Sequence, residues 1–218
     1  KAYQKFVPEK GLELLGRHSI TDIRLGDHSE CLMSVLFSDI RDFTSITEKM
    51  TASESFDFIN DYLKVMEPII EKHNGFIDKY IGDAVMALFP ETLGADDAVR
   101  AAIEMMTALH GFNASRLSRG LIPINIGVGV NTGNLILGTI GGDIRMEETV
   151  IGDTVNVASR MESLNKQFGT QILISELTFK SISKNLGLEV RNIGFTAIKG
   201  KAEKLAETEK KIPEAEKK

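Results

Sequence analysis

The sequence contains a single cysteine, Cys31, and no tryptophan, and it has no apolar run long enough to cross a membrane. One cysteine cannot form an internal disulfide or a metal site built from several thiolates, and such cysteine usage is typical of a reducing compartment. A membrane-spanning helix needs about 20 mostly apolar residues. The first residues also lack the apolar core of a signal peptide. We therefore expect a cytoplasmic protein with no membrane segment in this part of the chain.

The chain also lacks an excess of positive charge. Its formal net charge is −5, so broad attraction to nucleic acid is not expected. Its 218 residues, 42% of them hydrophobic, are enough for one domain with a proper core. The sequence begins with lysine, and we expect it to be a fragment of a longer protein.

Apolar periodicity predicts an α+β fold. Helical spacing recurs over 51–75 and 94–120, while 31–39 is typical of a buried strand and two short strands flank Gly82-Asp83. The alternation over 123–141 predicts a hairpin that turns at Asn-Thr-Gly. A strand and helix are expected over 147–169, and a strand, a helix and a closing strand pair over 170–201. This order resembles a ferredoxin-like (split βαβ) core with a small C-terminal α+β extension.

Composition divides the chain into three parts. We expect an N-terminal lead-in over 1–31, with a short helix near 9–16, and a central domain over 32–201. Residues 202–218 are almost all charged or alanine, and they predict a solvated helix or a disordered tail.

The stretch "FIDKYIGDAVMALF", residues 76–89, places Lys79 and Asp83 inside a mostly apolar run. A charge removed from water is costly unless it is paired or bound to a metal. One interpretation is that Gly82-Asp83 is a hairpin turn and that Lys79 reaches solvent. The other is that Asp83 and Asp39, which ends the preceding buried strand, share a sheet edge where Mg²⁺ or Mn²⁺ relieves their repulsion. These residues alone leave both interpretations open.

A second polar group lies in "TVIGDTVNVASRMESL". Asn156 and Arg160 are four residues apart on a predicted helix, hence on one face. An arginine there could hold a phosphate by a bidentate contact. The alternative is a solvated helix face, which is the commoner position of these residue types.

Four stretches together resemble the catalytic domain of the class III nucleotidyl cyclases. They are, in order, "VLFSDIRDFTSITE", "GFIDKYIGDAVMALF", "INIGVGVNTGNLILGTIGG" and "VIGDTVNVASRMESL". The resemblance runs from about residue 33 to residue 201. It implies an enzyme that converts a nucleoside triphosphate into its 3′,5′-cyclic monophosphate and pyrophosphate.

The resemblance assigns Asp39, Asp83 and the carbonyl of Ile40 as ligands of two Mg²⁺ or Mn²⁺ ions in each site. One ion is implied to activate the ribose 3′-hydroxyl for in-line attack on the α-phosphorus, and the other to anchor the β- and γ-phosphates. The backbone amides of Phe43 and Thr44 are implied to contact phosphate. No P-loop motif occurs in the sequence.

Lys79 and Thr149 match the pair that reads the purine. A lysine with aspartate or threonine marks adenine specificity in this family, and hence ATP as substrate, whereas guanylate cyclases have a glutamate and a cysteine. The lysine–threonine pair resembles the bacterial and soluble-type branch, whose members are often stimulated by bicarbonate. We therefore also expect activation by bicarbonate.

The remaining matched positions complete the implied site. Asn156 matches the residue that orients the ribose, and Arg160 the one that stabilises charge on the α-phosphate in the transition state. Lys199 matches a triphosphate-binding lysine, although a solvated lysine at a strand end is the alternative. Arg145 matches a further phosphate ligand at loose spacing.

In this family the metal ligands come from one subunit, and the purine, ribose and transition-state residues come from the other. All of these positions are filled on this one chain, which implies a homodimer with two equivalent sites. We also expect this chain to be an output domain that is fused to upstream regulatory domains.

Three alternatives to an adenylate cyclase stay open. A guanylate cyclase differs only in substrate, and Lys79 with Thr149 disfavours it. A catalytically inactive regulatory domain would lack one or more of the matched residues. An RNA-binding ferredoxin-like domain would need exposed aromatic residues on a central strand and a basic face.

Overall fold

The computed structural model describes residues 9–90, 93–142, 144–198 and 201–209. One mixed sheet has the strand order β2-β3-β1-β4-β6-β8-β7, and β5 pairs with β4 beside this path. Strands β4 and β6 run parallel, whereas β1 lies antiparallel to both β3 and β4. The strands are β1 His28–Ile40, β2 Phe76–Ile81, β3 Ala84–Pro90, β4 Ile126–Gly141, β5 Met146–Ile151, β6 Ile172–Ser175, β7 Glu189–Ile198 and β8 Lys201–Glu209.

The helices are α1 Glu9–Leu14, α2 Phe43–Thr47, α3 Ala52–Lys72, α4 Gly94–Ser118, α5 Asp153–Phe168 and α6 Glu176–Ser181, with short 3₁₀ turns at Ile20–Asp22 and Lys184–Leu186. Helix α3 begins with a capping box. The Thr51 hydroxyl accepts from the Glu54 amide at 3.2 Å, and the Glu54 carboxylate accepts from the Thr51 amide at 2.7 Å. This reciprocal pair satisfies two amides that a helix start leaves without partners.

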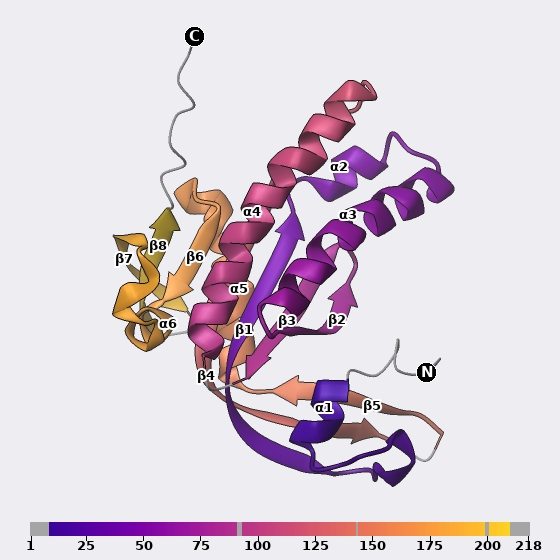
Figure 1. Cartoon of the computed structure of the whole chain (residues 1–218), viewed down its shortest axis with the longest axis vertical. Coiled ribbons are helices and arrows are strands. Elements are labelled where there is room, and N and C mark those ends of the chain that lie inside the picture. Colours follow the sequence, from indigo (N-terminus) through magenta and orange to yellow (C-terminus); the bar gives the residue numbers. More distant parts are fainter. Residues whose placement is uncertain (1–8, 91–92, 143, 199–200, 210–218) are drawn as a thin grey trace.

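Helices cover both faces of the sheet. Figure 1 shows α3 and α4 crossing one face, where their apolar residues form the largest core cluster with β1, β3 and β4. A second cluster on the other face joins the sheet to α5 and to residues at the end of α1. The α+β class is confirmed, as are the helices expected over 51–75 and 94–120 and the strands flanking Gly82-Asp83.

The hairpin predicted within 123–141 is wrong, because β4 runs unbroken through Asn131 and Thr132. Both residues stay in register with β1, opposite Val35 and Ser34. The Asn131 amide donates to the Thr154 carbonyl at 2.9 Å, and the Thr132 hydroxyl lies 2.7 Å from that of Ser34. The Asn131 amide nitrogen and the Thr132 hydroxyl thus have buried partners, whereas such side chains usually favour an exposed turn.

The expectation of a solvated helix or disorder beyond residue 201 is wrong for residues 202–209, which belong to β8. This strand pairs with β7 on one side and with β6 on the other. The closing strand pair therefore exists, but its second strand lies in the charged segment. Pairing on both edges satisfies the backbone whatever the composition of the strand. Residues 210–218 lie outside the described part.

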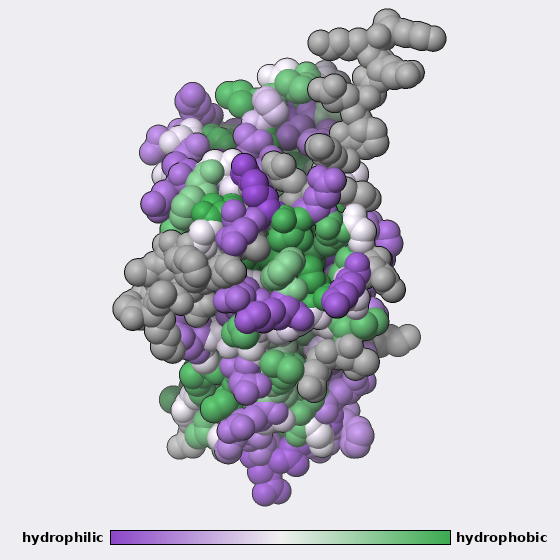
Figure 2. Space-filling view, turned by 90° about the vertical axis from the view of Figure 1, so that its left-hand side faces the viewer, coloured by the Kyte–Doolittle hydropathy of each residue, from purple (hydrophilic) through white to green (hydrophobic). Residues whose placement is uncertain are grey.

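Surface hydropathy is mixed. The face in Figure 2 carries apolar area near its middle, bordered by hydrophilic side chains. Other exposed apolar side chains lie on β4 and β5, namely Ile136, Ile140, Met146 and Ile151. Among the described residues, no helix combines the length and apolar character needed to span a membrane.

Candidate active site

Two aspartates meet at one edge of the sheet. Asp39 lies at the end of β1, and Asp83 follows Gly82, which takes the left-handed conformation (φ 65°) in the β2–β3 turn. Because β1 pairs with β3, the turn comes next to the end of β1. The Ile40 amide donates to Asp83 Oδ2 at 3.2 Å. Burial is the largest cause that raises the pKa of Asp83, which is about 7. The hydrogen bond with Asp39 and the negative charge of Asp39 raise this pKa further.

This edge fits a hard divalent cation. Two adjacent carboxylates that resist ionising together are stabilised by a cation between them. Within the described ranges, no group of three or more His, Cys, Asp or Glu side chains could hold a metal. The protein ligands available here are therefore two carboxylates and the nearby carbonyl of Ile40, which leaves coordination positions for oxygens of a substrate or water.

Helix α2 begins directly after this edge, so Phe43 and Thr44 stand in its first turn. The Phe43 ring stacks on Phe58 of α3, with centroids 6.1 Å apart. The guanidinium of buried Arg116 lies 4.5 Å above the Phe58 ring. The start of α2 is thereby packed against α3, and Phe58 of α3 in turn contacts Arg116 of α4.

The ammonium of Lys79 lies among three oxygen groups. It donates to the Thr149 hydroxyl at 2.8 Å, and it lies 3.3 Å from Glu147 and 3.4 Å from Asp78. A register shift in β2 between Ile77 and Lys79 turns the Asp78 side chain inward, where it is 2% exposed. Burial raises the pKa of Asp78, and the positive charge of Lys79 opposes that rise.

A further carboxylate, that of Glu148, lies near Asp78 and Lys79. Burial and the charge of Asp78 raise the pKa of Glu148 to about 7, against the opposing effect of Lys79. The carboxylate of Glu148 is packed against Gly11 of α1, and its Oε2 has no hydrogen-bond partner among the described residues. Sequence analysis missed Asp78 and Glu148. The only signal for Asp78 was a second charge inside the apolar run of β2.

Helix α5 carries Asn156 and Arg160. Asn156 is exposed and Arg160 is half-buried. Within the part of the chain that the structure describes, no hydrogen bond or ion pair joins either residue to Asp39 or Asp83. The structure therefore does not bring the two groups of candidate residues into direct contact within one chain.

The remaining two candidate residues are Arg145 and Lys199. The Arg145 side chain is 84% exposed, and its guanidinium lies 3.5 Å from the Glu147 carboxylate. Lys199 lies outside the described residues.

Sequence analysis also missed an ion pair beside the aspartate edge. Arg41 Nη1 lies 2.7 Å from Glu162 Oε1 on α5. Arg41 follows Ile40 directly, but nothing in the sequence indicates that its partner lies on a helix far along the chain.

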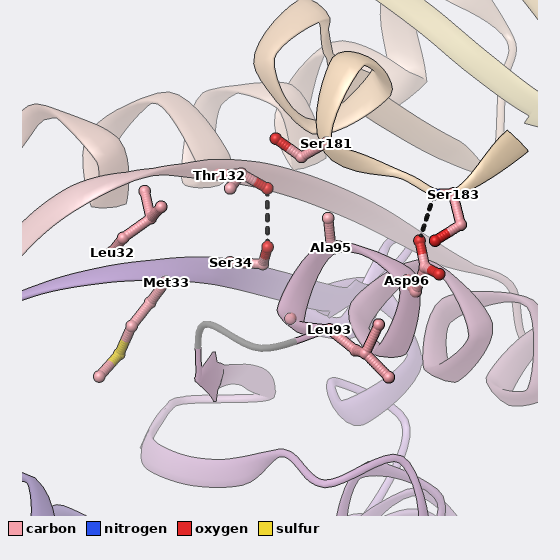
Figure 3. Close-up of a pocket in the computed structure, with 10 residues that line it drawn as sticks. Leu32, Met33, Ser34, Leu93, Ala95, Asp96, Thr132, Ser181 and Ser183 are labelled. Carbon is pink, nitrogen blue, oxygen red and sulfur yellow. Dashed lines mark hydrogen bonds between the residues drawn. The ribbon is translucent and has the colours of Figure 1, made fainter.

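A separate cavity of about 160 Å³ lies between the start of α4, β1, β4 and the end of α6 (Figure 3). The Ser34–Thr132 hydroxyl pair and Asp96, which accepts from the Ser183 amide at 2.7 Å, face it. None of the candidate catalytic, metal-binding or substrate-binding residues lines this cavity.

Comparisons with known proteins show which family the chain is similar to. Residues 27–210 match the adenylate and guanylate cyclase catalytic domain. The chain is 42% identical over 210 residues to an adenylate cyclase of Anabaena cylindrica, covering 94% of this chain and 42% of that protein. It is also 42% identical over 203 residues to the terminal-differentiation-specific adenylate cyclase of Dictyostelium discoideum, covering 91% of this chain and 10% of that protein. The chain thus spans less than half the length of these curated relatives.

Solved structures are similar as well. The adenylyl cyclase CyaB from P. aeruginosa has a TM-score of 0.75 and 33% identity, covering 84% of this chain and 96% of that one. The guanylyl cyclase Cya2 has a TM-score of 0.72 and 30% identity, covering 85% of this chain and 93% of that one. The chain belongs to the family of adenylate and guanylate cyclase catalytic domains.

Proposed function

We propose that this chain is the catalytic domain of an adenylate cyclase, which converts ATP to 3′,5′-cyclic AMP and pyrophosphate. The observation that carries this proposal is the 2.8 Å contact between Lys79 of β2 and Thr149 of β5. Lys79 lies on the same β2–β3 hairpin that supplies Asp83. Family membership alone does not select the base, because adenylyl and guanylyl cyclases both resemble this chain.

The chemistry of the pair favours adenine. Adenine N1 is a hydrogen-bond acceptor and its 6-amino group is a donor. An ammonium donates only, whereas a hydroxyl oxygen can accept. Guanine presents an N1–H donor and an O6 acceptor, so Lys79 would face a donor with a donor. A site that leaves such groups unpaired discriminates strongly against the wrong base.

The aspartate edge would hold the metal. Asp39, Asp83 and the Ile40 carbonyl are the ligands we propose for two Mg²⁺ or Mn²⁺ ions, whose bound charge would neutralise the triphosphate and lower the pKa of the ribose 3′-hydroxyl. Around that position the protein residues would orient the substrate for in-line attack. The proposed roles are phosphate binding for Phe43, Thr44, Arg145 and Lys199, ribose orientation for Asn156, and stabilisation of negative charge on the α-phosphate for Arg160.

We also propose a homodimer with two shared sites. Asn156 and Arg160 make no hydrogen bond or ion pair with Asp39 or Asp83 in the described part of one chain, so a second copy would have to bring them together. Exposed apolar residues on β4 and β5, including Ile136, Ile140 and Ile151, offer surface for such an association. A closed two-fold dimer would then contain two identical sites.

The region over 32–201, with the strand residues on either side of it, would form a single catalytic domain. Its relatives are longer than this chain, which supports the proposal that it is the output domain of a larger signalling protein. Stimulation by bicarbonate is a further proposal, based on Thr149 beside Lys79. A dose series at constant pH tests it, and a flat response would contradict it.

The decisive experiment measures cyclic nucleotide formation from ATP or GTP with Mn²⁺ or Mg²⁺. Asp39→Asn and Arg160→Ala are assayed separately and then mixed. Cyclic AMP from the wild type, none from either variant, and up to about a quarter of the wild-type activity after mixing are expected, because a mixed dimer would keep one intact site. Absence of product from a folded dimer under both metals would instead indicate a regulatory domain, and preference for GTP would indicate a guanylate cyclase.

A further inference from the structure

Helix α5 contacts the turn after the aspartate edge through two ion pairs of opposite polarity. Arg41 Nη1 lies 2.7 Å from Glu162 Oε1, and Asp42 Oδ1 lies 2.9 Å from Lys166 Nζ. Arg41 and Asp42 are consecutive in the turn, while Glu162 and Lys166 are one helical turn apart on α5. The helix therefore contacts both residues that separate Ile40 from the start of α2.

The Arg41–Glu162 pair is largely buried, and it lies against Gly127. The side chains of Arg41 and Glu162 are 19% and 8% exposed, and Arg41 Nη2 also donates to the Glu162 carbonyl at 3.0 Å. A Cβ atom at Gly127 of β4 would collide with the Arg41 guanidinium. Glycine at this position is thus required for the guanidinium to reach α5.

The second pair holds a backbone conformation that few side chains adopt. Asp42 has φ 55°, in the left-handed region, where aspartate is among the better-tolerated residues other than glycine. On the other side of the turn, the Arg41 amide donates to the Asn125 carbonyl at 2.8 Å. The turn is therefore fixed by the sheet and by α5 together.

We propose that Glu162 and Lys166 are positioning residues, which act through Arg41 and Asp42 to fix the turn between the metal ligands and the phosphate-binding amides. This turn lies between Asp39-Ile40 and Phe43-Thr44, so its orientation sets where those groups stand relative to one another. The inference rests on the proposed function of this edge. The same helix carries Asn156 and Arg160, so α5 would position residues of both halves of the site.

The exposed pair allows a test in which positioning and simple electrostatics predict opposite results. Lys166→Asp adds negative charge near the metal edge, so electrostatics alone would strengthen Mn²⁺ binding. Positioning predicts that Mn²⁺ binding weakens about threefold, because Asp42 then faces a like charge. Asp42→Asn keeps a residue that tolerates the left-handed conformation but removes the ion pair, so it should weaken binding as well, whereas Lys166→Arg keeps the pair and should bind Mn²⁺ as the wild type does.

Two readouts other than activity decide the result. Electron paramagnetic resonance of free Mn²⁺ gives the dissociation constant, and amide hydrogen exchange reports the order of residues 42–47. Lys166→Asp and Asp42→Asn should exchange faster in that segment, and Lys166→Arg should keep the wild-type rate. Lys64→Asp is the matched control, since Lys64 pairs with Asp61 on the exposed side of α3. This variant should leave both readouts unchanged.

Tighter or unchanged Mn²⁺ binding in Lys166→Asp, with unchanged exchange over 42–47, would overturn the proposal. Absence of Mn²⁺ binding in the wild type would also overturn it. Glu162→Gln should weaken Mn²⁺ about tenfold or more, because it leaves buried Arg41 without its counter-charge. If that variant does not fold, the exposed pair alone decides. A separate ATP assay distinguishes failure of the cyclase activity from failure of this inference.

Discussion

The ammonium nitrogen of Lys79 lies 2.8 Å from the hydroxyl oxygen of Thr149, although 70 positions separate the two residues in the chain. Strand β2 carries the lysine and β5 carries the threonine, and these strands do not pair with each other. Their contact therefore depends on how β1, β3 and β4 hold the two outer strands. The contact between Lys79 and Thr149 is thus a property of the whole sheet.

Thr149→Val should lower kcat/KM for ATP about tenfold, because it removes one hydrogen bond to the base while keeping the side-chain volume. Thr149→Ser keeps the hydroxyl and should stay within about threefold of the wild type. Steady-state kinetics with ATP and GTP checks both. A loss in Thr149→Ser with none in Thr149→Val would show that the methyl group, and not the hydroxyl, matters.

Exchanging the pair should exchange the substrate. In Lys79→Glu with Thr149→Cys, the carboxylate accepts from guanine N1–H and the thiol donates weakly to O6. We expect the ratio of GTP to ATP turnover to rise by about 100-fold or more, since each mismatched polar group is left unpaired against the wrong base. Competition between the two nucleotides in one reaction measures this ratio directly.

Glu148→Gln should stabilise the fold at alkaline pH. The pKa of Glu148 is raised to about 7, above the unfolded value near 4.5, so the native state holds its proton more tightly. Stability from this group is present below about pH 4.5 and is lost as pH rises towards about 7. The variant should therefore gain about 2 °C or more in Tm at pH 8, with a smaller gain at pH 5.

Partial solvent access at Glu148 reduces this effect below what the full shift implies. Glu30→Gln is the matched control, because that carboxylate is exposed on β1. Thermal unfolding from pH 5 to pH 8 provides the comparison. A gain of the same size in Glu30→Gln would attribute the effect to net charge and not to burial.

Asp83→Asn should raise stability and abolish catalysis at the same time. Burial and Asp39 raise the pKa of Asp83 to about 7, so its charge is unfavourable in the folded state without a cation. In a chelator at pH 8, the variant should melt about 2 °C or more above the wild type. Adding Mn²⁺ should then raise the Tm of the wild type and not that of the variant. A variant that responds to Mn²⁺ as the wild type does would place the metal elsewhere.

Gly129→Ala should destabilise the protein by about 1–3 kcal/mol, because a Cβ there would collide with backbone atoms of Ala158 and Glu162 on α5. Gly111→Ala is the opposite case, since that glycine lies in α4 with nothing within 4 Å of its added Cβ. It should stabilise by about 0.5–1 kcal/mol, as expected of alanine in a helix interior. Urea unfolding of both variants checks the pair, and similar effects in both would contradict the packing argument.

The sequence by itself determined the features that depend on neighbours in the chain. The helical spacing of apolar residues over 51–75 predicted α3, since this pattern acts within a few residues. Lys79 and Asp83 in "FIDKYIGDAVMALF" and the polar face of α5 identified the candidate residues. Their order along the chain carried the resemblance to the cyclase family.

Only the tertiary structure decided features whose partners are distant in the chain. Asn131 and Thr132 predicted a turn, but buried partners on α5 and β1 keep them in a strand. The charged segment after residue 201 predicted a tail, but the open edges of β6 and β7 pair with it. Local composition does not show which strand edges or side chains will find a partner far along the chain. Long-range pairing satisfies the backbone whatever the local composition is.

The same reason applies within the site. The sequence identified Asp39, Asp83, Lys79 and Thr149, but not the burial of Asp78 or of the Arg41–Glu162 pair. Burial sets the cost of a charge, and it follows from what packs above a residue rather than from the residue itself. The sequence thus shows which chemical groups are candidates for this site, while the fold determines their ionisation and orientation.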